Sequence, residues 1–197
     1  MAYADTWSIR PATVSDSYFF ASAAIGAGGA ITLLKSDLAI NGAGYQVLFS
    51  SSGDSSGRTF TITGTTVGQL TGSTSEVVTA PAAGLTTHST NYWATVTGIS
   101  ISGASTGNIK IGFTGSLALP RCRIRGVHYV GAASAGSIVV TMNSTTGTEI
   151  LGIDTPATAT FAEYVRTNHI LTARSAALSD FAIVTLTQVT KVTLFLT

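Results

Sequence analysis

The chain has 197 residues, of which 45% are hydrophobic and only 10% are charged, and its formal net charge is +1. Ordinary soluble domains carry about 25% charged residues, and this hydrophobic content excludes a largely disordered chain. A charge so close to zero excludes a global field that would attract nucleic acid or a membrane surface. We therefore expect a packed protein that associates with itself or with partners.

Residues 1–18 predict an extended N-terminal arm. Pro11 prevents a regular helix there, and the segment lacks the apolar run of a signal peptide. The Trp7 side chain either inserts into a neighbouring subunit or packs back onto its own domain. The sequence leaves both roles open.

The segment after the arm changes from an ambiguous pattern to a clear one. Over residues 18–40, apolar residues on both sides of a glycine-rich centre fit a strand, a break and then a second strand or a short helix. From Tyr45 onward, two alternating runs flank the turn residues 53–57, which predicts a hairpin. Further strands are expected over residues 75–79, 92–101 and 109–113.

The second half of the chain also has a strand pattern, and residues 115–120 resemble a short connector. Within this half, residues 161–166 are the best candidate for a segment that is not a strand. The predicted fold class is all-β. We expect two small antiparallel β-sandwich-like domains, over residues 19–116 and 119–197, preceded by the extended N-terminal arm.

One internal similarity suggests a repeat. Residues 99–103 with 107–109, and residues 127–131 with 136–138, both combine a strand, a turn of small residues and a second strand. Gene duplication explains this similarity, and so does one type of hairpin used twice.

Residues with catalytic or metal-binding chemistry are few and scattered. A zinc site would need pairs of ligands at short spacing, which the histidines do not provide, and Cys122 is the single cysteine. Serines are plentiful, but the sequence has no Gly-x-Ser-x-Gly motif. We expect no catalytic residue, no metal and no cofactor. The three histidines are His88, His128 and His169.

The most distinctive charged cluster is the triplet Arg121, Arg123 and Arg125, which alternates with Cys122 and Ile124. On a regular strand, this spacing places all three guanidinium groups on one face. Arginine suits bidentate pairing with carboxylates. The triplet therefore either contacts a protein partner, pairs with acidic residues of the same chain, or touches nucleic-acid phosphate. Neither the net charge nor the aromatic content favours a dedicated nucleic-acid binder.

Tyr92 and Trp93 are the aromatic pair that could serve as a platform for sugars. This pair motivates an alternative of another class, a carbohydrate-binding or adhesion module. Adjacent strand residues face opposite ways, so one of the two rings is expected in the core.

Several segments resemble a β module that is common in structural proteins of tailed bacteriophages. They are residues 59–65 (TFTITGT), 75–81 (SEVVTAP), 92–100 (YWATVTGIS) and 107–112 (GNIKIG). In the second half, residues 125–129 (RGVHY), 147–151 (GTEIL) and 192–196 (VTLFL) are similar in style to small phage virion proteins.

The resemblance implies a non-enzymatic virion protein, assembled in the host cytoplasm, that binds and reinforces the capsid lattice as a cement or decoration protein. A neck or tail ring component is the alternative within the same class. The implied partners are the major capsid protein or other virion proteins, together with further copies of the chain, and no membrane. On this interpretation, Trp7 and the arginines at 121, 123 and 125 are interface residues.

Overall fold

The structure is a computed structural model that describes residues 5–9, 15–35, 44–67, 69, 72–119, 123–142, 146–157, 162–170 and 182–196. These residues form fifteen strands and no helix, and every strand pairing is antiparallel. The predicted all-β fold class is therefore confirmed.

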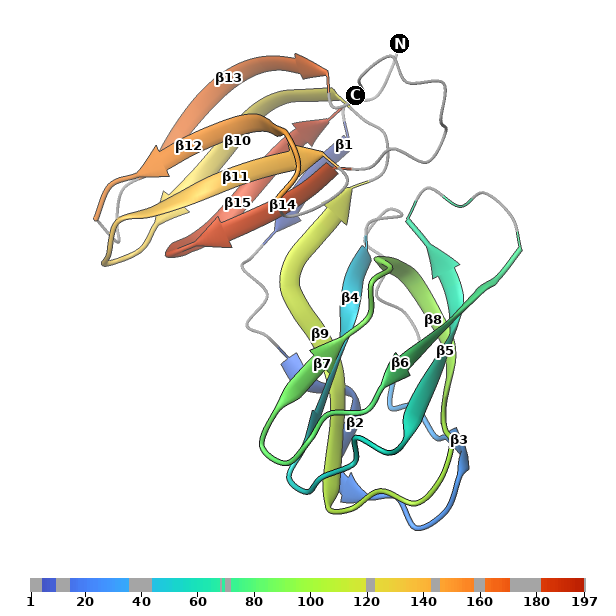
Figure 1. Ribbon diagram of the computed structural model, residues 1–197. Coiled ribbons are helices and arrows are strands. Elements are labelled where there is room, and N and C mark those ends of the chain that lie inside the picture. The colour runs from blue at the N-terminus through green and yellow to red at the C-terminus, as the bar shows by residue number, and fades with distance from the viewer. Residues whose placement is uncertain are drawn as a thin grey trace. The chain divides into compact units, whose positions relative to one another are not determined.

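The chain divides into two compact units (Figure 1). We call residues 14–114 the inserted unit, because they interrupt the sequence of the other unit. We call residues 1–13 and 115–197 the host unit. One strand, β9 (Asn108–Leu119), begins in the inserted unit and ends in the host unit.

The inserted unit has two layers of strands. One layer has the order β2-β9-β4-β7, and the other has the order β3-β8-β5-β6. A single pairing of Tyr45 with Trp93 links β4 to β8, so the two layers belong to one hydrogen-bonded sheet. The bounds are β2 (Ser15–Ala24), β3 (Gly29–Ile31), β4 (Gly44–Ser51), β5 (Thr59–Thr66), β6 (Thr74–Thr79), β7 (Thr86–His88) and β8 (Trp93–Ile101).

The core of the inserted unit follows from alternation along these strands. In β5 the apolar residues are buried and the threonines between them are only partly buried. Phe49 of β4 and Phe60 of β5 are fully buried and stack with ring centroids 4.3 Å apart, which joins the two layers. Burial of each such ring contributes about 1.5–3 kcal/mol. Other fully buried side chains are Phe19, Ile62, Trp93, Val96, Ile109 and Ile111.

The host unit is built in the same way. One sheet has the order β1-β15-β10-β13, and the other has the order β12-β11-β14 followed by the end of β9. The buried side chains of this unit include Ile124, Val127, Tyr129, Ile138, Val140, Ile183 and Leu194. The bounds are β1 (Asp5–Ile9), β10 (Arg123–Gly131), β11 (Gly136–Met142), β12 (Glu149–Thr155), β13 (Ala162–Ile170), β14 (Ala182–Thr187) and β15 (Val189–Leu196).

The two units have the same strand order. When the eight strands of each unit are numbered along the chain, both units pair them as 1-8-3-6 in one layer and 2-7-4-5 in the other. This is the order of a jelly roll, an eight-stranded double sheet made of two Greek keys. β9 serves as the eighth strand of the inserted roll and as the second strand of the host roll.

The internal similarity seen in the sequence does not follow this structural repeat. Its first copy joins strands seven and eight of the inserted unit, β8 and β9, whereas its second copy joins strands three and four of the host unit, β10 and β11. The sequence similarity therefore marks one kind of connection between layers that is used at two different places.

One prediction for the second half is wrong. Residues 161–166 were expected to be the segment that is not a strand, but β13 runs from Ala162 to Ile170. It pairs with β10 from Arg123↔Ile170 to Val130↔Ala162. The backbone hydrogen bonds to β10 outweigh the weak local strand signal of this segment.

The N-terminal residues are shared between the two units. β1 pairs with β15 along its whole length, with Trp7 opposite Leu194, whereas β2 of the inserted unit begins at Ser15. The units meet between residues 114 and 115, and the sequence analysis placed the boundary between 116 and 119. The orientation of the Trp7 side chain lies outside the described residues, so its role in an interface stays a prediction.

We predict that residues 14–114 fold as an isolated fragment. This unit has its own core, and its two ends are adjacent because Ser15 pairs with Phe113. Urea unfolding should be cooperative, and the substitution F60A should lower the free energy of unfolding by about 3–5 kcal/mol. A fragment without dispersed amide signals in an NMR spectrum would contradict the prediction.

Candidate functional site

Four loops of the inserted unit meet at one end of its jelly roll (Figure 1). They are residues 25–28, 52–58, 80–85 and 102–107, which connect strands one to two, three to four, five to six and seven to eight. Loops on a rigid scaffold are common locations for binding residues. We call this set of loops the four-loop end.

Serine side chains tie the four loops together. The Ser105 hydroxyl accepts a hydrogen bond from the amide of Ile25 at 2.9 Å, and the Ser52 hydroxyl accepts one from the amide of Asn108 at 2.8 Å. Ser55, which is 2% exposed, accepts a hydrogen bond from the amide of Thr106. The amide of Ser55 donates in turn to the carbonyl of Pro81 at 3.1 Å.

Close backbone approach adds to this rigidity. A Cβ atom on Gly53 would overlap the carbonyl oxygen of Thr106, so loops 52–58 and 102–107 touch where only glycine fits. Gly107, on the same loop as Thr106, has a φ of +101°, a conformation that residues with a side chain rarely adopt. The four-loop end is therefore fixed before any partner arrives, which lowers the entropic cost of binding.

Two charged side chains lie at this end. The carboxylate of Asp54 accepts a hydrogen bond from the amide of Ser56 at 3.0 Å. Hydrogen bonding from the Ser56 side chain, and then from this amide, holds the pKa of Asp54 below its usual value. The guanidinium Nε of Arg58 donates to the carbonyl of Ala104 at 3.2 Å. Both side chains are exposed, so the four-loop end carries no concentrated charge of one sign from this pair.

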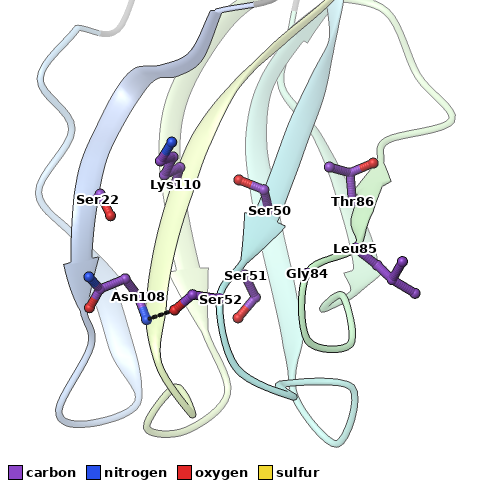
Figure 2. Close-up of a pocket in the computed structure, with 9 residues that line it drawn as sticks. All are labelled: Ser22, Ser50, Ser51, Ser52, Gly84, Leu85, Thr86, Asn108 and Lys110. Carbon is purple, nitrogen blue, oxygen red and sulfur yellow. Dashed lines mark hydrogen bonds between the residues drawn. The ribbon is translucent and has the colours of Figure 1, made fainter.

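A hollow of about 210 Å³ lies beside the four-loop end, on strands β2, β4, β7 and β9 (Figure 2). Seven of the nine lining residues have polar or charged side chains, and Lys110 is the one charged residue among them, although the exposed surface of the hollow is more apolar than polar. The lining residues are Ser22, Ser50, Ser51, Ser52, Gly84, Leu85, Thr86, Asn108 and Lys110.

The arginine triplet is only partly described. Arg123 and Arg125 belong to β10, whereas Arg121 lies outside the described residues. The register of β10 shifts between Ile124 and Gly126 toward both neighbouring strands. Along β10, the buried apolar residues change from an even position, Ile124, to the odd positions Val127 and Tyr129. This irregularity interrupts the strict alternation on which the one-face prediction depends. The interface role of the triplet stays a prediction.

The proposed aromatic platform is not available to a sugar. Tyr92 is 6% exposed and Trp93 is 0% exposed, so both rings belong to the core, where the sequence analysis placed only one. Within the described part of the chain, the indole N–H of Trp93 has no hydrogen-bond partner.

The histidines do not form a cluster with acidic residues in the described ranges. Among those residues, no group of three or more histidine, cysteine, aspartate or glutamate side chains could hold a metal ion. His88 places its Nδ1 3.0 Å from the carbonyl oxygen of Ser89.

None of the described elements is a helix that is long and apolar enough to cross a membrane.

Comparison with family models, curated proteins and solved structures finds no match to this chain.

Sequence reasoning missed the four-loop end. The run of residues 51–57, SSGDSSG, was expected to close a hairpin. The structure places a turn there, but the hairpin is wrong, because β4 and β5 lie in different layers and do not pair. The sequence gives no indication that Ser52 and Ser55 bond to a loop about 50 residues away. The one available indication of such side-chain bonds was the presence of four serines in and just before a turn that contains glycine.

We predict that G53A destabilises the inserted unit, whereas G57A in the same loop does not. A methyl group on Gly53 must push two loop backbones apart, which costs about 1–3 kcal/mol or more. Gly57 has no atom within 4 Å of its Cβ position, so its substitution should change the free energy of unfolding by less than about 0.5 kcal/mol. Urea unfolding measures both. Equal effects would contradict the close approach.

We predict a loss of stability in alkali from Tyr92. Burial raises its pKa to about 12. Because the unfolded chain ionises near 10, stability is complete below pH 10 and falls as the pH rises toward 12. Because solvent screens part of this shift, the loss should be on the order of 1 kcal/mol. In Y92F the loss should be smaller, with the remainder due in part to Tyr45, whose pKa burial also raises. Urea unfolding at several alkaline pH values measures this, and identical profiles for both proteins would contradict it.

Proposed function

We propose that this protein is a non-enzymatic structural component of the virion of a tailed bacteriophage that binds and reinforces the capsid lattice. Its partners are the major capsid protein or other virion proteins, together with further copies of the same chain. It assembles with them in the host cytoplasm.

The observation that carries this proposal is the jelly roll, which occurs twice in one chain. Jelly rolls are shared by viral capsid domains and lectin domains. A fold alone does not assign a function, so the composition provides the second support. A chain with 10% charged residues and a net charge of +1 has little electrostatic protection against association.

The surface of the inserted unit is consistent with docking. Leu34, Val77 and Leu85 are large apolar residues that are each at least 60% exposed. Leu85 lies at the four-loop end, where the serine bonds fix the surrounding backbone. A stable interface needs about 1,200–2,000 Å² of buried surface in total. The predicted contacts of the host unit are Trp7 in the N-terminal segment and the arginine triplet at the start of β10.

The arginine triplet provides a direct test. Replacing Arg121, Arg123 and Arg125 together by alanine should weaken incorporation into particles, because pairs with acidic groups on the partner are lost. The wild-type protein should dissociate from particles as salt is raised, and the variant should lose much of this salt dependence. Quantitative mass spectrometry of purified particles at several salt concentrations measures both effects.

The control removes positive charge elsewhere on the chain, as K110A/K191A. This control should enter particles like the wild type. If the arginine variant is incorporated normally, with unchanged salt dependence, the triplet has no role in the interface. If the protein is absent from purified particles, the proposed function itself is wrong.

A further inference from the structure

The hollow beside the four-loop end has a regular construction. Ser22 of β2, Lys110 of β9, Ser50 of β4 and Thr86 of β7 come from four neighbouring strands of one layer (Figure 2). Ser50 and Thr86 are directly paired. For Ser50 and Lys110, the chain neighbours Phe49, Ile109 and Ile111 are buried in the core, so alternation turns these two side chains outward. Ser22 and Thr86 are exposed.

The floor of the hollow is fixed by bonds within the chain. The Ser51 hydroxyl donates to the carbonyl of Gly53 at 2.6 Å, and the side chain is only 4% exposed. The Ser52 hydroxyl accepts from the amide of Asn108. The backbone of Gly84 donates to the carbonyl of Ser51 at 2.8 Å. These bonds hold the rim and floor in one arrangement without a ligand.

Other groups in the hollow are available to a ligand. Within the described residues, the hydroxyls of Ser22, Ser50 and Thr86 and the carboxamide of Asn108 have no hydrogen-bond partner in the protein. Three hydroxyls can each donate and accept, and the amide adds two donors and an acceptor. Leu85, at 60% exposure, adds one apolar surface at the rim.

This chemistry excludes several ligand classes. A peptide partner needs buried aromatic, arginine or other large anchors, and the lining offers one leucine. Single-stranded nucleic acid needs aromatic platforms and a cationic groove, and the lining has no aromatic residue and one lysine. A metal ion needs carboxylate, imidazole or thiolate ligands, and none lines the hollow. A ligand dense in hydroxyl groups remains.

We propose that this hollow binds a saccharide, with one sugar unit seated against Ser22, Ser50, Thr86 and Asn108. Sites for drug-sized molecules have volumes of about 300–1,000 Å³, and this hollow is smaller. A hollow of this size fits one unit of a longer glycan. Hydrogen bonds to neutral groups contribute only about 0.5–1.5 kcal/mol each, so a single copy binds weakly. Many copies on one surface raise the avidity by about 10²–10⁴-fold. The proposal does not depend on the virion role.

The test uses the full-length protein coupled at high density to fluorescent beads. The beads are applied to a printed array of bacterial surface polysaccharides and of neutral and acidic oligosaccharides. We expect binding to a defined subset of glycans. The variant S22L/T86L, which removes two hydroxyls and fills the hollow, should reduce that signal by about tenfold or more.

The matched control is S75L/T79L, which makes the same exchanges at two exposed positions of β6, in the other layer of the inserted unit. It should retain the wild-type signal. Thermal unfolding of all three proteins verifies that they are folded, and the milder variant T86V replaces S22L/T86L if that protein unfolds. Absence of binding to every glycan, or equal binding by the hollow variant, would overturn the proposal.

Discussion

The structure depends on one strand that belongs to two cores. β9 buries Ile109 and Ile111 in the inserted unit, and then Leu117 and Leu119 in the host unit. Its first part pairs with β2, and its last part pairs with β14. Because Ser15 lies opposite Phe113, the chain enters and leaves the inserted unit at one place. An eight-stranded unit can therefore interrupt the host jelly roll between its first and second strands without breaking any of its pairings.

The two units carry different candidate surfaces. The jelly-roll order brings four connections to one end of the inserted unit, where serine bonds fix their backbones. The outward face of the adjacent layer carries the hydroxyl-lined hollow. The host unit contains the N-terminal strand and the start of β10, where the predicted interface residues lie.

The sequence predicts the elements far better than their arrangement. Alternation identifies β5, because its apolar residues Phe60 and Ile62 recur at every second position and are buried. It fails at β13, whose pairing with β10 decides its conformation, and at Tyr92, which precedes the first residue of β8 and is buried together with Trp93. The jelly-roll order and the hollow arise from contacts between residues that are far apart in the sequence, as in the pairings of Ser15 with Phe113 and of Asp5 with Leu196. Such contacts leave no local pattern.

The measurement that tests the central claim most directly is the number of copies of the protein in purified native particles, combined with its mass in solution by light scattering. The account predicts a small oligomer in solution and on the order of hundreds of copies per particle, spread over a symmetric lattice. A closed ring present in about six or twelve copies would instead indicate a neck or tail component. Absence from the particles would contradict the account.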